Sequence, residues 1–163
     1  MRVSWGFDAH RLGGDPPVLL AGVVVDSGRG VLATSDGDLV AHAVADALLG
    51  AAGLGDLGAH FPSSDPRWED ADSMGLLTRV VDMCSQLDIR YLDVTVIAQE
   101  VRVAPHRTAI EEALAAVLGI DAELVSVKAT TTDGMGAIGA GEGIAATAVV
   151  TAMTAATGAS GGD

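Results

Sequence analysis

An aspartate and two histidines give the clearest chemical signal in this sequence. Asp8 and His10 lie two residues apart in the run GFDAH, and His42 follows the run SDGD at residues 35–38. One carboxylate and two imidazoles leave a position of a tetrahedral Zn²⁺ open for substrate, which is typical of a catalytic metal site. The spacing fits equally well two polar groups at a strand end and a surface histidine paired with a carboxylate on its own helix.

A strand and a helix must bring these three groups together. Residues 3–7 predict a strand that leads into the GFDAH run. Side chains two apart on a strand leave the same face, so Asp8 and His10 are expected to point together. The third group, His42, falls on a helix expected from about residue 38 to 54.

Two more carboxylates accompany His42 on this helix. Asp38 and Asp46 lie one turn before and one turn after it. At that spacing either carboxylate can accept the second ring N–H of a metal-bound imidazole and fix its tautomer. The polar turn before the helix is expected to supply its N-cap, from Ser35 or Asp36.

A second polar segment follows a later strand. Residues 125–131 alternate between apolar and polar types, as a half-buried strand does, and a glycine-rich loop comes next. Hydroxyl and backbone N–H groups of Thr130, Thr131 and Thr132 could hold a phosphate there. Asp133 could bind a harder cation such as Mg²⁺. The alternative is an ordinary turn.

A long loop at residues 53–72 is a third candidate. Long loops in compact domains often carry function. Asp56, Ser63, Ser64 and Asp65 could share hydrogen bonds with sugar or polyol hydroxyls. The alternative is a solvated acidic loop. Arg102, further along the chain, could contact a phosphate, and the alternative is contact with solvent alone.

The remaining pattern indicates an α+β fold. Amphipathic stripes predict helices that begin at Asp72 or Ser73 and at Pro105, the second ending near Gly119. Further strands are expected at residues 18–25, 91–101, 125–131 and 144–153, with helix as an alternative for the last. This order of elements favours a mixed sheet with helices packed on one face.

Length and composition limit the class of protein. The 163 residues fit one domain, expected at residues 1–155 and followed by a flexible tail at 156–163. The net charge is −13 and Lys128 is the only lysine, so no basic surface for nucleic acid is expected. No apolar run reaches the roughly 18 residues of a membrane span. The lone Cys84 and the absence of a signal-peptide pattern favour a cytoplasmic protein.

Several separated runs together resemble the 2-C-methyl-D-erythritol 2,4-cyclodiphosphate synthase family of the non-mevalonate isoprenoid pathway. The resemblance extends from residue 3 to about residue 150. The matching runs are GFDAH at 6–10, SDGD at 35–38 with His42 and Asp46, ALLGAAGLGDLG at 47–58, FP at 61–62, DP at 65–66, IAQ at 97–99, KATTT at 128–132 and GEGIA at 141–145.

The resemblance implies a fold, metals and a reaction. The family forms homotrimers in which a mixed four-stranded sheet, with helices on one face, surrounds a threefold axis, and the active sites lie between subunits. Asp8, His10 and His42 would bind Zn²⁺, and Asp133 would bind Mg²⁺ or Mn²⁺ through substrate phosphates. The substrate would be 4-diphosphocytidyl-2-C-methyl-D-erythritol 2-phosphate, whose 2-phosphate attacks the β-phosphorus, so that a cyclic diphosphate closes and CMP leaves.

The resemblance also assigns individual residues. Thr131 matches a threonine that stabilises the transition state, and Thr34 stands where a phosphate-contacting histidine is usual. Ser35, Thr130 and Thr132 are expected to contact substrate. The segment for methylerythritol comprises Asp56, Leu57, Gly58, Phe61, Pro62, Ser63, Ser64 and Asp65. The segment for cytosine and its phosphates includes Ala98, Arg102, Val103 and Ala104.

Two other functions stay open alongside the cyclase. One is a metal-dependent phosphoesterase that uses a zinc-bound hydroxide on a nucleotide or polyol phosphate. The other is a non-catalytic trimer that binds metal and nucleotide. The products would distinguish them, because the cyclase consumes no water and releases CMP in many turnovers.

One departure from the family concerns the centre of the trimer. Ala137 and Ala140 stand where the family has an aromatic residue and an arginine, near a central channel associated with isoprenoid diphosphate binding. Because the cation and the aromatic wall are both missing, we expect this chain to bind such a ligand weakly.

Overall fold

The computed structural model describes residues 1–68 and 70–154, so the tail expected at 156–163 lies outside the described residues. The strands are β1 (Arg2–Gly14), β2 (Val18–Leu20), β3 (Val23–Asp26), β4 (Gly30–Leu32), β5 (Leu87–Ala98), β6 (Val125–Thr130) and β7 (Gly143–Thr154). The α-helices are α1 (Leu39–Ala52), α2 (Leu57–His60), α3 (Ser73–Met83), α4 (Arg107–Leu118) and α5 (Gly136–Gly139). The 3₁₀-helices are η1 (Pro66–Trp68), η2 (Ala104–His106) and η3 (Ala122–Leu124).

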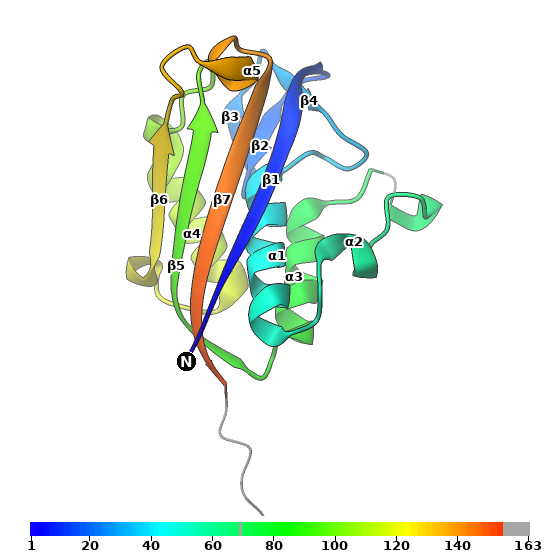
Figure 1. The fold of residues 1–163 in the computed structure, drawn as a ribbon, viewed down its shortest axis with the longest axis vertical. Coiled ribbons are helices and arrows are strands. Elements are labelled where there is room, and N and C mark those ends of the chain that lie inside the picture. The colour runs from blue at the N-terminus through cyan, green and yellow to red at the C-terminus, as the bar shows by residue number, and fades with distance from the viewer. Residues whose placement is uncertain (69, 155–163) are drawn as a thin grey trace, which may run out of the picture.

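A mixed sheet with helices on one face forms the framework, as the order of elements predicted. Its strands run in the order β4-β1-β7-β5-β6, and only the β5–β6 pair is parallel. Helices α1, α3 and α4 cover one face (Figure 1). The expected number of four strands is wrong, because β4 adds a fifth. This three-residue strand pairs with the far end of β1, from Arg11 to Gly14.

The apolar run at residues 18–25 is not one strand. It divides into β2 and β3, which form a separate two-stranded sheet. Ala21 and Gly22, between them, both have positive φ angles of 51° and 74°. A strand cannot pass through that conformation, so the chain turns back on itself. The run at 144–153 lies within β7 and is a strand, not the helix left as an alternative.

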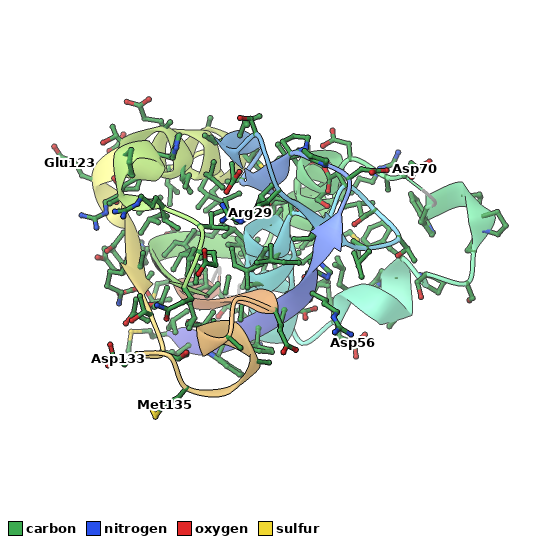
Figure 2. The ribbon with its side chains drawn as sticks, turned by 90° about the horizontal axis from the view of Figure 1, so that it is seen from above. Arg29, Asp56, Asp70, Glu123, Asp133 and Met135 are labelled. Carbon is green, nitrogen blue, oxygen red and sulfur yellow. The ribbon has the colours of Figure 1, made fainter. Side chains whose placement is uncertain are left out.

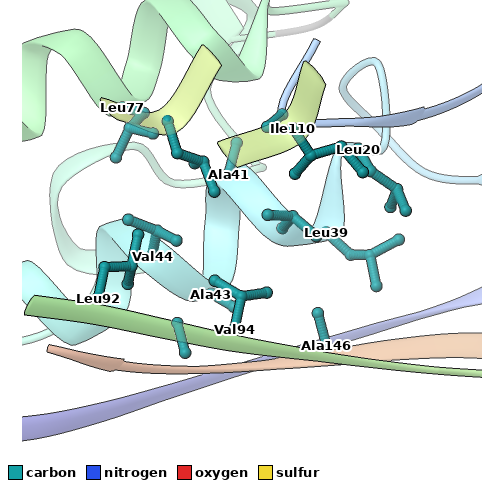
Figure 3. Packing of buried hydrophobic residues seen from close by; sticks show 14 of the residues in the cluster. Leu20, Leu39, Ala41, Ala43, Val44, Leu77, Leu92, Val94, Ile110 and Ala146 are labelled. Carbon is teal, nitrogen blue, oxygen red and sulfur yellow. The ribbon is translucent and has the colours of Figure 1, made fainter. Parts of the chain in front are cut away.

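The core lies between α1 and the sheet. Ten of the fourteen residues of α1 are buried, and many of them are alanines. Figure 3 shows Ala43 and Val44 of this helix over Leu92 and Val94 of β5. Small side chains let the helix approach the strands closely, which fits a sequence with only 3% aromatic residues.

Gly6 shows how closely α1 approaches β1. A Cβ atom at this position would lie 2.0 Å from the carbonyl oxygen of Ala43. Only glycine leaves room for that contact. Two residues further along the same face of β1 comes Asp8, so the contact at Gly6 sets the distance between Asp8 and the helix that carries His42.

The helix ends follow capping rules, with one correction. Asp38, not Ser35 or Asp36, is the N-cap of α1, and its carboxylate accepts from the backbone N–H of Ala41 at 3.0 Å. Asp72 caps α3, one of the two residues expected there. Helix α4 ends at Gly119, which has a left-handed conformation, as predicted. None of the helices in the described part of the chain has the length and apolar character that crossing a bilayer requires.

The other face of the sheet carries several exposed apolar side chains. We call it the open face, because helices α1, α3 and α4 all cover the opposite one (Figure 1). The short helix α5 contacts β5 and β7. The large exposed residues of the open face are Val3, Trp5, Phe7, Tyr91 and Met153. The rings of Trp5 and Phe7 stack with their centroids 5.9 Å apart.

Candidate metal centre

Asp8, His10 and His42 come together as the sequence pattern predicted. The first two project from the helix-covered face of β1, and the third projects from α1 toward them. One ligand atom from each lies within 4.8 Å of the other two. The Asp8 Oδ2 atom is 2.9 Å from His42 Nδ1 and 3.2 Å from His10 Nε2. The three side chains thus converge on one point from two elements.

The protein groups fit a divalent metal ion. The Nε2 atom of His10 is buried and has no hydrogen-bond partner among the described residues, since its contact with Asp8 lacks hydrogen-bond geometry. A buried polar atom left without a partner is costly, and coordination of a cation would satisfy it. The donor set of two imidazole nitrogens and one carboxylate oxygen suits Zn²⁺. Access remains, because the three side chains are 15–23% exposed.

Electrostatics favour an ionised carboxylate at this point. Burial raises the pKa of Asp8, but the hydrogen bond with His42 and the close charge interactions with both histidines outweigh burial, and the pKa falls well below its usual range. Burial lowers the pKa of His42, but the Asp8 carboxylate and the nearby charges of Asp38 and Asp36 outweigh it and raise the pKa above normal. The anionic Asp8 therefore attracts positive charge, which a proton supplies without metal and a cation supplies with it.

A cavity lies at the ends of β5 and β6, across β7 from the strand that carries Asp8 and His10. Its volume is about 620 Å³. Its lining comprises Ala98, Gln99, Glu100, Val101, Arg102, Val103, Ala104, Pro105, Ala129, Thr130 and Thr131. The sequence-predicted residues for cytosine and phosphate, together with Thr130 and Thr131, therefore share one hollow.

The loop after β6 contains Thr132 and Asp133, the other two site residues predicted in this region. Asp133 has a positive φ of 51°, and its carboxylate accepts from the Thr131 hydroxyl at 3.2 Å. The Thr132 hydroxyl donates to the Met135 carbonyl at 2.7 Å. Asp133 is not part of the three-residue metal group.

The loop at residues 53–72 contains two short helices. Asp56 caps α2, which contains Leu57 and Gly58, and its carboxylate accepts from the Ala59 N–H at 2.9 Å. In the same loop, Phe61 packs edge-on against Trp68, Pro62 follows it, and Asp65 pairs with Arg67.

A smaller cavity gathers other residues predicted to bind substrate. Its volume is about 380 Å³, and Thr34, Ser63 and Ser64 line it with Asp70. Ser35 lines a neighbouring cavity of about 600 Å³. Thr34 and Asp70 are also joined by a backbone hydrogen bond of 3.0 Å, from the Asp70 N–H to the Thr34 carbonyl. The Thr34 turn and the end of the long loop therefore lie side by side.

Within a single chain, the metal ligands and the 620 Å³ cavity lie apart. Strand β7 lies between β1, which carries two of the ligands, and β5, which leads into the cavity. Figure 2 shows Asp133 and Met135 on one flank of the molecule and Asp56 and Asp70 on the other. The predicted site residues thus form two separate groups within a single chain.

Comparison with known proteins shows the family to which this chain belongs. The model of the YgbB family matches residues 1–153. The chain belongs to the YgbB family. That match spans the three metal-ligand candidates and the residues of the cavity alike.

Relatives of this YgbB-family chain carry a common name. The 2-C-methyl-D-erythritol 2,4-cyclodiphosphate synthase of Moorella thermoacetica is 49% identical, over 92% of this chain and 93% of that protein. The synthase of Salinibacter ruber is 46% identical, over 95% of this chain and 100% of that protein. A solved synthase of this name in its CDP-bound form is 32% identical with a TM-score of 0.84, over 93% of this chain and 100% of that one.

The YgbB-family chain has two residues at this centre that sequence reasoning missed. The expected partner of the second ring nitrogen of His42 was Asp38 or Asp46, and this expectation is wrong. His42 Nε2 lies 2.9 Å from the hydroxyl of Ser73, which in turn donates to Asp36. The sequence predicts that Asp36 and Ser73 lie in the capping turns of two different helices. Nothing in the local sequence indicates that the start of α3 packs against α1.

Asp38 and Asp46, the two carboxylates expected beside His42, make structural contacts instead. Asp38 is fully buried, and it accepts from the Gly22 N–H at 2.6 Å in addition to capping α1. Asp46 accepts from the Leu57 N–H at 2.7 Å and so holds the start of α2. Burial is the main cause that raises the pKa of each of these carboxyls.

Proposed function

We propose that this chain is a 2-C-methyl-D-erythritol 2,4-cyclodiphosphate synthase of non-mevalonate isoprenoid precursor biosynthesis. It converts 4-diphosphocytidyl-2-C-methyl-D-erythritol 2-phosphate to the 2,4-cyclodiphosphate with release of CMP, as a phosphorus–oxygen lyase. The observation that carries the proposal is the Asp8, His10 and His42 cluster, in a chain that matches named synthases over more than nine-tenths of its length. The CDP-bound relatives support a cytidine nucleotide ligand.

Two cations complete the proposed site. Asp8, His10 and His42 hold Zn²⁺, and Asp133 holds Mg²⁺ or Mn²⁺ together with substrate phosphates. Bound cations supply Lewis acidity toward phosphoryl oxygens and neutralise their charge. They also explain how a chain of net charge −13 accepts an anionic substrate, because a local cation outweighs distant charges that salt screens.

The chain itself has to position one flexible molecule. An oxygen of the 2-phosphate forms a bond to the β-phosphorus, and the bond from that phosphorus to the bridging oxygen of CMP breaks. Attacking and leaving groups belong to the same substrate, so no water is consumed and no covalent enzyme intermediate is needed. Holding both ends in a ring-closing geometry is the main catalytic contribution in such a reaction.

The predicted residues divide this work. The backbone-rich segment with Ala98, Arg102, Val103 and Ala104 holds the cytidine end. At the other end, Thr34, Ser35 and the segments Asp56–Gly58 and Phe61–Asp65 hold the methylerythritol phosphate. Thr130, Thr131 and Thr132 offer hydroxyl groups to the phosphates between them. Thr131 stabilises the transition state by hydrogen bonding.

A homotrimer would bring the two groups of site residues together. Within one chain they lie on opposite flanks, and the exposed apolar residues of the open face suit burial against another subunit. We therefore propose trimers whose open faces surround a threefold axis, with each active site between neighbouring subunits. The chain acts as a single domain of residues 1–155 in the cytoplasm, on a small molecule and not on nucleic acid or membranes.

Phosphorus NMR tests the proposed reaction directly. The purified protein is incubated with the cytidyl substrate, Zn²⁺ and Mg²⁺. We expect resonances of CMP and of a cyclic diphosphate in equal amounts, in many turnovers per subunit. Linear phosphate products would support the phosphoesterase instead. An absence of turnover would leave the non-catalytic binding trimer.

A further inference from the structure

A chain of hydrogen bonds leads away from the metal centre on the far side of His42. The Nε2 atom of His42 lies 2.9 Å from the Ser73 hydroxyl oxygen. That hydroxyl donates to Asp36 Oδ1, and the Ser73 backbone N–H donates to Asp36 Oδ2 at 3.0 Å. Ser73 is only 1% exposed, so bulk water does not compete for these bonds.

The order of donors and acceptors along this chain has only one consistent direction. A serine hydroxyl can donate one hydrogen bond and accept others, whereas an ionised carboxylate can only accept. Because Asp36 takes the hydroxyl proton, the Ser73 oxygen is left to accept from His42. The Nε2 atom of His42 then carries a ring proton that it keeps when a cation binds. Its Nδ1 atom lies 2.9 Å from Asp8 Oδ2 and donates to that carboxylate without metal, so only the Nδ1 proton has to leave for a cation to bind there.

Asp36 is itself held in place by the backbone around it. Its carboxylate also accepts from the Asp38 N–H at 3.2 Å, and its own N–H donates to the Ala71 carbonyl at 3.3 Å. These bonds join the turn before α1 to the segment that begins α3. Two segments far apart in the sequence therefore fix the orientation of one imidazole ring.

We propose that Ser73 and Asp36 are positioning residues that hold His42 in the Nε2–H tautomer and thereby set the affinity of the centre for its cation. The inference rests on the proposed zinc centre but not on the reaction. Partners of this kind orient metal-bound histidines, and their removal typically costs about 10–100-fold in metal affinity. Without Asp36, the Ser73 hydroxyl is free to donate to Nε2, which favours the tautomer that cannot bind metal through Nδ1.

The test measures zinc affinity of the full-length protein by competition with a chelator. We expect Ser73→Ala and Asp36→Asn each to weaken binding by about 10–100-fold. Asparagine is nearly isosteric with aspartate, but one of its two positions is a donor, so it cannot accept from both groups of Ser73. The double variant is expected to bind no more weakly than the weaker single variant, because both substitutions break one path.

A matched control separates positioning from helix stability. Asp72→Asn alters the N-cap of the same helix α3, whose carboxylate accepts from the Met74 N–H at 3.1 Å and does not contact His42. We expect this variant to keep wild-type zinc affinity. Thermal unfolding of the metal-free variants reports folding independently, and Asp36→Asn still tests the proposal if Ser73→Ala fails to fold.

Nitrogen-15 NMR of the histidine rings gives a second readout. In the zinc-loaded wild type we expect a slowly exchanging His42 Nε2–H proton, which Ser73→Ala should make fast-exchanging. Zinc affinity within twofold of wild type in both single variants, or additive losses in the double variant, would overturn the proposal. Failure of the wild type to bind zinc would instead overturn the proposed zinc centre.

Discussion

The metal centre and the 620 Å³ cavity differ in how the protein builds them. The centre consists of three side chains on a long strand and a buried helix that touch each other closely. The cavity is lined mainly by small and apolar residues at and just after the ends of β5 and β6. Reactive side chains are recognisable from their types and spacing. A pocket lined mainly by small and apolar residues gives little such signal. The hydroxyl groups of Thr130 and Thr131 indicate a phosphate, but the segment for cytosine is predicted only by resemblance to a family.

The comparison implies that the two regions respond differently to substitution. A ligand set of three has no redundancy, so losing one member should remove the function of the whole centre. A pocket lined by many weak contacts should lose affinity by degrees. Strand β7 separates the two regions, so changes in one should leave the other intact.

The largest effect is expected for His42→Ala. This variant should lose stoichiometric zinc and at least about a hundredfold in turnover, because Lewis-acid stabilisation is worth several kcal/mol. Alanine is a strong helix former, so α1 should persist. Elemental analysis measures the zinc, and circular dichroism checks the helix. His106→Ala removes a histidine outside the centre and should keep the metal. One zinc per subunit in His42→Ala would contradict the ligand assignment.

Thr131→Val should come next. It replaces a hydroxyl with a methyl group of similar size, and we expect turnover to fall about a hundredfold, as when one preorganised hydrogen-bond donor is lost. Zinc content should stay at the wild-type level, because Thr131 lies in the cavity region. Steady-state kinetics and metal analysis of the same preparation decide the point. A loss of zinc would show that the two regions are not independent.

Arg102→Ala should have a smaller effect that falls on binding. The Arg102 side chain lines the cavity and is exposed, so its loss should raise KM about tenfold with kcat nearly unchanged. Arg90→Ala is the matched control, since Arg90 is an exposed arginine paired with Asp88 away from the cavity. Equal KM values for the two variants would remove Arg102 from the proposed site.

The smallest effect is expected for an isoprenoid diphosphate. Ala137 lies in α5, and Ala140 follows directly as its C-cap; neither offers a cation or an aromatic ring. A calorimetric titration with geranyl diphosphate should therefore show no saturable binding at micromolar concentrations. Tight, saturable binding would contradict the prediction and would identify a third binding region, distinct from the two compared above.

Local patterns predicted the main elements because each pattern reports its own segment. The apolar stripes of α1, α3 and α4 and the alternation of β6 follow directly from helix and strand periodicity. The two-residue spacing of Asp8 and His10 likewise fixed their common face. In these cases burial and backbone geometry agree along a continuous stretch of chain.

The missed features depend on contacts between distant segments. Strand β4 is three residues long and forms only because the end of β1 lies beside it. The turn at Ala21 and Gly22 is held from afar by Asp38, whose carboxylate accepts the Gly22 N–H. That same contact occupies the carboxylate expected near His42. Ser73 reaches His42 for a similar reason, since helix packing and not sequence spacing joins them.

The missing side chain at Gly6 has a consequence for redesign of this protein. A methyl group there would meet the Ala43 carbonyl at 2.0 Å and push the helix outward. His42 would move with the helix, and the ion would lose a ligand although no ligand had been mutated. Efforts to retune the metal preference should therefore leave the strand-to-helix clearance untouched and vary only residues that do not set it.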